Sequence, residues 1–315
     1  MGENIKVIAV VGPTASGKTA LGVRLAERLG GEVVSCDSMQ IYREMKIGTA
    51  APTEEEMRGI PHHMIGFCDP RMNYSAADYV DDASRVIADI AERGKLPIIV
   101  GGTGLYLDSL LFIGSFSEAG EDPAIREELF RIASEEGPSA LHSMLREIDP
   151  EAAEKIHENN VKRVVRAIEV YRLTGKTKTE ADREALAPTP RYDATVVTLD
   201  FEDRATLYGR IEKRVDKMFA DGLEDEVRDL LERGELPDSS TAAQAIGYRE
   251  TAAMIRGEIG RDEAAELIKK NTRNYAKRQL TWFRRYDGIR ILVDEGGAIR
   301  TAEQIAEEII RRMKA

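Results

Sequence analysis

The octapeptide GPTASGKT occupies residues 12–19, between two segments of different character. Residues 5–11 (IKVIAVV) form a short, β-branched apolar run, which is typical of a strand buried on both faces. Residues 20–29 place three leucines on one face of a predicted helix, and the pair Gly30-Gly31 is expected to end it. The octapeptide matches G-x-x-x-x-G-K-[ST], the pattern of a phosphate-binding loop, in the strand–loop–helix setting that such a loop requires.

The parts of this loop hold phosphate oxygens in different ways. Glycines let backbone amides turn inward, the following helix adds its N-terminal dipole, Lys18 adds a point charge, and Thr19 offers a hydroxyl to Mg²⁺. The pattern, shared with nucleotide- and ATP-binding proteins, predicts a di- or triphosphate site with Mg²⁺ as cofactor and Thr19 as its ligand. It does not tell whether the phosphate is donor, effector or leaving group. The predicted phosphate-binding residues are Gly12, Pro13, Thr14, Ala15, Ser16, Gly17, Lys18 and Thr19.

Further apolar runs at residues 32–36, 96–100, 194–199 and 289–293 alternate with helical patterns. This alternation predicts an α/β protein with a P-loop NTPase-like, doubly wound parallel sheet. From about residue 122 to residue 184 the sequence shows only charged helical segments and no strand pattern. We therefore predict an inserted all-helical domain at 121–189, and a core domain that combines 1–120 with 190–315 and carries the C-terminal helices.

Composition narrows the class of protein. The 315 residues are 42% hydrophobic and 32% charged, which fits a folded protein of about two domains. The net charge of −11 excludes a chain that is basic overall, but not a local basic patch. No apolar run approaches the roughly 20 residues of a membrane span, and the N-terminus has no apolar signal region. We expect a cytoplasmic protein without a membrane partner and, since nothing demands a dimer, a monomer.

Asp37 directly follows the second predicted strand, where ligands of open α/β sheets bind. Its carboxylate could hold Mg²⁺ through water or accept a proton from a nucleophile; alternatively, it caps the next turn together with Ser38. The third strand ends in glycines at 101, 102 and 104 instead of the apolar run and aspartate of many motor-type ATPases. This ending disfavours an ATP-driven machine but leaves small-molecule kinases open.

Two basic stretches stand out in this acidic chain. Residues 269–286 contain seven lysines and arginines, four aromatic residues and no acidic residue, and residues 162–178 contain six cations and one glutamate. Such local clusters fit contacts with a nucleic-acid backbone, although solvated helix faces are the alternative interpretation. Lying in separate predicted domains, the clusters could clamp a polyanion. Trp282 is expected to belong to the core rather than to stack on a base.

Arg210 and Arg214 lie four residues apart on the helical segment after the fourth predicted strand. They could reach over the phosphate loop as lid arginines. The alternative is surface pairing with Glu212 or Asp216, which would contribute little to stability.

Eight segments, taken in order, carry a resemblance to a known family. They are GPTASGKT (12–19), DSMQIYREMKIGTAAPT (37–53), PHHMI (61–65), YSAADY (74–79), VGGTGLY (100–106), KRVVRAIEVYRLTGK (162–176), QAIGYRE (244–250) and TRNYAKRQLTWFRR (272–285). Together they resemble the bacterial tRNA dimethylallyltransferases, also called tRNA isopentenyltransferases, over nearly the whole chain. The chain departs from the family's usual pattern at Glu44, Lys46 and Ala51.

The resemblance implies transfer of the dimethylallyl group of dimethylallyl diphosphate to N6 of adenosine 37 of tRNA. It implies Asp37 as general base, and Lys18, Thr19, Arg210 and Arg214 as catalytic residues that hold the diphosphate together with Mg²⁺. The helical insertion would grip the anticodon stem-loop. The implied tRNA-binding residues are Asp37, Ser38, Met39, Gln40, Thr103, Lys162, Arg163, Val164, Val165, Arg166, Gln244, Arg273, Lys277 and Arg278.

Three other functions remain open at this point. A small-molecule P-loop kinase would explain the phosphate loop but leave both basic stretches without a role. A prenyltransferase acting on free AMP or ADP would need no RNA-gripping insertion. A nucleotide-switched RNA-binding protein would need no catalytic carboxylate at Asp37.

Overall fold

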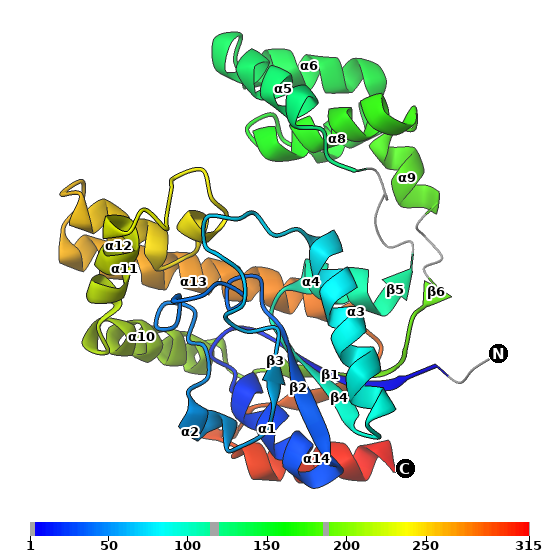
Figure 1. The fold of residues 1–315 in the computed structure, drawn as a ribbon, viewed down its shortest axis with the longest axis vertical. Helices are drawn as coiled ribbons and strands as arrows, with labels where there is room; N and C mark the ends of the chain where they lie inside the picture. Colours follow the sequence, from blue (N-terminus) through cyan, green and yellow to red (C-terminus); the bar gives the residue numbers. More distant parts are fainter. Residues whose placement is uncertain (1–3, 114–119, 185–188, 315) are drawn as a thin grey trace. The chain divides into compact units, whose positions relative to one another are not determined.

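The computed structural model describes residues 4–113, 120–184 and 189–314, which form two compact units (Figure 1). The first unit combines Met1–Leu111 with Tyr192–Ala315, and the second is Phe112–Arg191. The second unit is therefore longer than the expected insertion at 121–189. It includes the short antiparallel pair of β5 (Phe112–Ile113) and β6 (Thr189–Pro190), whose pairing joins the two ends of the helical segment.

A six-stranded parallel sheet forms the centre of the first unit, with strand order β3-β2-β4-β1-β7-β8. Its strands are β1 (Lys6–Val11), β2 (Gly31–Cys36), β3 (His62–His63), β4 (Leu96–Gly101), β7 (Asp193–Asp200) and β8 (Ile289–Leu292). The predicted doubly wound α/β fold is confirmed, and five of these strands were expected. The sixth, β3, pairs with β2 through only two residues, too few to give a periodic pattern.

Helix α1 (Lys18–Leu29) begins inside the phosphate loop, two residues earlier than its leucine pattern indicated. Gly30 ends it in the left-handed conformation, with φ of 69°. Gly31 instead opens β2, where a Cβ atom would lie 2.5 Å from the Leu96 carbonyl oxygen. The other helices of this unit are α2 (Glu54–Met57), α3 (Ala76–Glu92), α4 (Gly104–Leu111), α10 (Arg204–Ala220), α11 (Leu223–Glu232), α12 (Tyr248–Ile255), α13 (Arg261–Phe283) and α14 (Ala302–Met313), with a 3₁₀ turn at Ala242–Gln244 and a small hairpin of β9 (Asp294–Glu295) and β10 (Ala298–Ile299).

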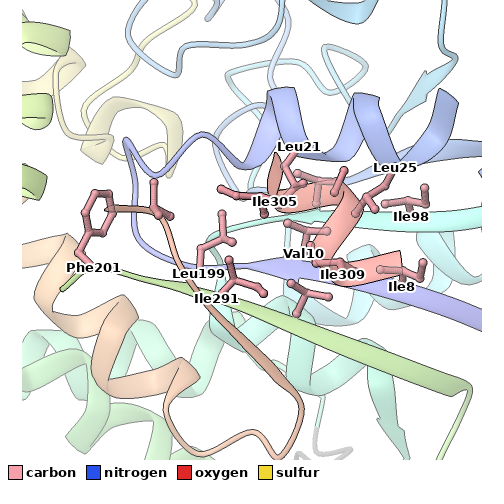
Figure 2. Packing of buried hydrophobic residues seen from close by; sticks show 14 of the residues in the cluster. Ile8, Val10, Leu21, Leu25, Ile98, Leu199, Phe201, Ile291, Ile305 and Ile309 are labelled. Atoms are coloured by element: carbon pink, nitrogen blue, oxygen red, sulfur yellow. The ribbon is translucent and has the colours of Figure 1, made fainter. Parts of the chain in front are cut away.

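The main core contains side chains from the strand that precedes the phosphate loop and from the helix that follows it. Figure 2 shows Ile8 and Val10 of β1 among Leu21 and Leu25 of α1 and Ile305 of α14. Each such side chain contributes about 1.5–3 kcal/mol when fully buried. The strand before the loop and the helix after it are therefore fixed by the same packed cluster.

The second unit consists of α5 (Pro123–Glu135), α6 (Pro138–Ile148), α7 (Pro150–Lys155), α8 (Val161–Thr174) and α9 (Lys178–Glu184). Three of these helices begin with proline at their first position, where its missing N–H costs nothing. Their own core includes Leu129, Leu141, Leu145 and Ile168. In the described part of the chain, no helix is both long and apolar enough to cross a membrane.

Candidate active site

A cavity of about 400 Å³ opens beyond the carboxyl ends of β1, β2 and β4. The five residues expected to be catalytic all line it, although they come from three separate stretches of the chain: Lys18, Thr19, Asp37, Arg210 and Arg214. The tertiary structure therefore brings three cations, a hydroxyl and a carboxylate to one cavity.

Two glycines of the phosphate loop have positive φ angles, which most residue types disfavour. Gly12 has a φ of 150°, and a Cβ atom there would lie 2.9 Å from the Leu199 carbonyl oxygen. Gly17, with φ of 88°, leads into α1. The Lys18 ammonium donates to the Pro13 carbonyl at 2.7 Å. Ser16 is buried, and its hydroxyl finds no hydrogen-bond partner among the described residues.

Of the eight predicted phosphate-binding residues, five line the cavity: Thr14, Ala15, Gly17, Lys18 and Thr19. Gly12, Pro13 and Ser16 lie outside its wall and shape the loop instead.

Lys18, Arg210 and Arg214 form no ion pair with any of the described residues. Burial and the nearby charge of Arg214 lower the pKa of Lys18 to about 7, against the opposing effect of Asp37. Burial also lowers the pKa of both arginines. Arg210 donates to the Ala15 carbonyl at 2.7 Å, and Arg214 donates to the Thr49 carbonyl at 3.2 Å. A bound polyanion would compensate these buried charges.

The alternative interpretation of Arg210 and Arg214 as surface ion pairs is wrong. Glu212 accepts from Arg273 at 2.9 Å, and Asp216 pairs with Lys269 at 2.9 Å. Both acids are thus engaged by helix α13, and the two arginines of α10 line the cavity instead.

The two interpretations of Asp37 that the sequence left open do not exclude each other in the structure. Its Oδ1 accepts the N–H groups of Met39 at 2.9 Å and Gln40 at 3.3 Å, so the side chain caps the following turn, though not through Ser38. Its Oδ2 accepts no hydrogen bond from the described residues. The cap holds the carboxylate at the cavity wall and leaves one oxygen available to a ligand.

The neighbours of Asp37 that were expected to bind RNA are largely engaged within the protein. Thr103 Oγ1 accepts the Ser38 N–H at 3.0 Å, which ties the ends of β2 and β4 together. The Gln40 amide donates to the carbonyls of Thr49 and Ala50 at 3.3 and 3.2 Å, and accepts from Ser35 at 3.1 Å. Met39 packs against a second core cluster.

Helix α13 presents part of the predicted RNA surface. Lys277 and Arg278 are exposed, with the Lys277 ammonium 5.9 Å from the Tyr208 ring and the Arg278 guanidinium 5.6 Å from the Tyr275 ring. Arg273 is held by Glu212, as described above, and so is less available to RNA than expected. Gln244 lies on the surface outside this helix and donates to the Asp238 carbonyl at 3.1 Å.

Trp282 is partly buried, close to the expectation that it belongs to the core. Its ring lies so near Gly104 that a Cβ there would be 2.4 Å away, and the Arg285 guanidinium covers it at 4.3 Å.

In the helical unit, the predicted RNA-binding residues divide into two groups. Lys162 and Arg163 are exposed at the start of α8. Val164 and Val165 are 0% and 2% exposed, so the expectation that their side chains contact RNA is wrong: they belong to the helical core. Arg166 donates to the buried Glu169 carboxylate at 2.7 Å and is mainly a structural residue.

Two residues that shape the site were not predicted from the sequence. Gln279 of α13 is 4% exposed, lines the cavity and bonds to the phosphate loop, but a single glutamine in a basic helix carries no recognisable signal. The Glu226 carboxylate accepts the N–H groups of Lys46, Ile47 and Gly48 at 2.8–3.2 Å, and the Tyr248 hydroxyl at 2.5 Å. This clamp fixes the loop whose Thr49 carbonyl holds Arg214.

The donor atoms present fit Mg²⁺. Thr19 Oγ1 makes no hydrogen bond with the described residues, and Asp37 keeps one carboxylate oxygen unbonded within them. Mg²⁺ prefers oxygen ligands, retains several waters and usually takes one or two protein ligands together with phosphate oxygens. A hydroxyl and a carboxylate beside a phosphate loop meet that requirement.

Known proteins resemble this chain along most of its length. Residues 40–286 match the family model described as IPP transferase. The tRNA dimethylallyltransferase of Caldanaerobacter subterraneus subsp. tengcongensis is 47% identical over 307 residues, covering 97% of this chain and 96% of the relative. That of Geobacter metallireducens is 50% identical over 286 residues, covering 90% of this chain and 91% of the relative.

Solved structures agree with the sequence comparisons. The full-length tRNA isopentenylpyrophosphate transferase of Bacillus halodurans is 41% identical with a TM-score of 0.69, covering 98% of this chain and 97% of that one. A eukaryotic dimethylallyltransferase, described as acting on tRNA, is 31% identical with a TM-score of 0.72, covering 89% of this chain and 70% of that one.

Proposed function

The chain belongs to the IPP transferase family, and from this membership we propose that it is a tRNA dimethylallyltransferase. It transfers the dimethylallyl group of dimethylallyl diphosphate to N6 of adenosine 37 of tRNA. The observation that carries the proposal is the meeting of Asp37 with Lys18, Arg210 and Arg214 in one cavity. A base and a cradle for a polyanion are the two parts that this reaction needs.

The phosphate loop holds a leaving group in this reaction. As the allylic C–O bond breaks, its electron pair goes to the diphosphate, where negative charge builds up. Lys18 and the two arginines lie where they stabilise that charge, together with the loop amides and the N-terminus of α1. Fixed cations in a partly buried site stabilise a developing charge more than water does.

Asp37 is the general base. The adenine amino group forms a bond to the allylic carbon and becomes acidic as that bond forms, so its proton must be accepted at that moment. The caps to Met39 and Gln40 fix one oxygen of Asp37, and the other is free to accept the proton.

Thr19 is the residue that would hold Mg²⁺, which leaves the free oxygen of Asp37 to accept the proton. When bound, the ion supplies charge neutralisation to the diphosphate.

The acceptor adenosine must leave the stacked anticodon loop to reach a cavity of this kind. We place the contacts to the tRNA backbone at exposed cations of each unit, Lys162 and Arg163 in one and Lys277 and Arg278 in the other. A net charge of −11 does not oppose this, because only the docking surface needs to be positive. With tRNA as acceptor, the reaction belongs in the cytoplasm.

The relatives named above do not support the kinase and free-AMP alternatives. They are tRNA dimethylallyltransferases, and their similarity extends over the helical unit, which an AMP-modifying enzyme would not need.

One assay tests the proposal. The protein is incubated with Mg²⁺ and radiolabelled dimethylallyl diphosphate, in parallel with unmodified tRNA, with AMP and without acceptor. Label on the adenosine after the anticodon is the expected result. Label on AMP would discard the RNA acceptor, and ATP consumption without any prenyl transfer would favour the kinase.

A further inference from the structure

Gln279 joins two segments that lie far apart in the sequence. It belongs to helix α13 and is 4% exposed. Its Oε1 accepts the N–H of Thr14 in the phosphate loop at 2.8 Å, and its Nε2 donates to the carbonyl of Gly102 at 2.8 Å. Both ends of the side-chain amide are therefore used, one on each segment.

The structure leaves little freedom around this bridge. A Cβ atom on Gly102 would lie 2.2 Å from Nε2 of Gln279, so the bridge requires glycine at this position. The Tyr275 hydroxyl, one helical turn earlier, donates to the same Gly102 carbonyl at 3.3 Å. Helix α13 thus makes two hydrogen bonds to the turn after β4.

The turn after β4 is also hydrogen-bonded to the segment that carries Asp37. Thr103 follows Gly102, its N–H donates to the Cys36 carbonyl at 3.2 Å, and its Oγ1 accepts the N–H of Ser38 at 3.0 Å. Asp37 lies between these two residues. A continuous set of hydrogen bonds therefore runs from the phosphate loop through Gln279 and the turn after β4 to the residues on either side of Asp37.

We propose that Gln279 is a positioning residue that sets the spacing between the phosphate loop and the Asp37 turn. The inference rests on the proposed function, in which these two segments hold the leaving diphosphate and the base. Reacting groups must be held at about 3–3.5 Å in the right orientation, and a misplacement of about 1 Å can cost about a hundredfold in rate. The bridge also takes up the Thr14 N–H, so the diphosphate is held by the amides that follow it in the loop.

The variant Gln279→Met keeps the length of the side chain and removes both hydrogen bonds. Leu280→Val is the matched control: Leu280 is the next residue of α13, is 7% exposed in the main core and does not line the cavity. Steady-state kinetics are measured with tRNA and dimethylallyl diphosphate, and the melting temperature of each variant is recorded. We expect Gln279→Met to lower kcat at least tenfold and to change the KM for tRNA less than threefold. Leu280→Val should lower the melting temperature and leave kcat within twofold of the wild type.

A kcat for Gln279→Met equal to that of Leu280→Val would overturn the proposal, as would a loss confined to the KM for tRNA. Should Gln279→Met fail to fold, Gln279→Glu replaces it. This variant has the same shape and still accepts from Thr14, but its carboxylate cannot donate to Gly102, so kcat should again fall.

A binding experiment separates this inference from the proposed function. Inorganic diphosphate is titrated into the full-length wild type and Gln279→Met in the presence of Mg²⁺, and at least threefold weaker binding by the variant is expected. A wild type that transfers no prenyl group to tRNA would refute the proposed function, and the diphosphate affinities would still decide whether Gln279 shapes the phosphate loop. Equal affinities in that case would refute the role of Gln279.

Discussion

Arg166 donates a hydrogen bond to Glu169 at 2.7 Å, and Glu169 has no exposed surface. Arg126, from helix α5, holds the same carboxylate at 2.9 Å. Burial alone would raise the pKa of Glu169, but the hydrogen bonds from Arg166 and Arg126 bring it below its usual range. Arg166 is therefore part of the interior of the helical unit, whereas Arg163, three residues earlier on the same helix and exposed, is available to a partner.

The variants Arg163→Gln and Arg166→Gln should separate RNA binding from stability. Arg163→Gln should weaken tRNA binding and reduce the slope of log K against log salt by about 1, as loss of one phosphate contact does, without lowering the melting temperature. Arg166→Gln should lower stability by about 2 kcal/mol, because it removes one charged hydrogen bond to Glu169 and leaves that of Arg126. Filter binding over a salt series and thermal unfolding measure the two effects. An unchanged salt slope in Arg163→Gln would move the docking surface elsewhere.

The variant Asp37→Asn isolates the proton acceptor from the turn cap. Asparagine retains an oxygen for the N–H groups of Met39 and Gln40 but cannot accept the proton. We expect turnover to fall at least about a hundredfold, with tRNA affinity and melting temperature preserved. Asp37→Ala serves as the comparison, because it also removes the cap and should lose about 1 kcal/mol of stability. Near-normal turnover in Asp37→Asn would remove Asp37 from the chemistry.

Lys18 should make the binding of diphosphate depend on pH. Its pKa in the free protein is lowered to about 7, and a bound anion would raise it. Below pH 7, Lys18 is charged in both states and contributes no pH dependence. Above pH 7, binding must take up a proton, so affinity should fall as pH rises, by up to about tenfold per pH unit. Calorimetric titrations at several pH values, in buffers with different ionisation enthalpies, measure the proton uptake.

Lys18→Arg is the control for this effect, since inorganic diphosphate itself titrates near neutral pH. Arginine stays protonated throughout this range, so the extra pH dependence of the wild type should vanish. Identical pH profiles for both proteins would contradict the lowered pKa.

Thr19→Ala should raise the Mg²⁺ concentration needed for half-maximal activity, because it removes a hydroxyl ligand next to the phosphate loop. Thr19→Ser keeps the hydroxyl and should behave nearly as the wild type. Titration of activity with Mg²⁺ measures both. An Ala variant with an unchanged requirement would place the ion on other ligands.

Glu226→Gln should loosen the loop that anchors Arg214. The carboxylate accepts three backbone N–H groups, and an amide can replace only one of its two oxygens as an acceptor. We expect weaker binding of inorganic diphosphate and a lower melting temperature. Tyr248→Phe removes a single hydrogen bond to Glu226, worth about 1 kcal/mol, and should have a smaller effect on both. Diphosphate affinity that is equal in Glu226→Gln and the wild type would show that Arg214 is held without this clamp.

Much of the fold could be read from local patterns. The apolar runs predicted β1, β2, β4, β7 and β8, because strands buried on both faces need continuous apolar side chains. Residues that favour helix ends also lie at the ends of helices in the insertion: Gly137, Asp149 and Asn160 precede helices and Gly175 follows one. These signals are local, since glycine, proline and capping side chains act on their own backbone.

Residue roles that depend on distant partners could not be read in this way. Arg163 and Arg166 belong to the same basic stretch at 162–178, and only the hydrogen bond of Arg166 to the buried Glu169 separates them. Local sequence also did not reveal that Arg210 and Arg214 are not paired with Glu212 and Asp216. Residues of helix α13 pair with both acids, and α13 is distant in the sequence.

The phosphate loop, the doubly wound sheet and the inserted helical unit could all be predicted from the sequence, because each follows from side-chain periodicity or from backbone demands within a few residues. Which side chains meet around the loop is a property of the folded chain. Gln279 lies 265 residues from Thr14, and Glu226 lies 178 residues from Gly48. Such pairings depend on how helices pack across the sheet, and no local pattern encodes them.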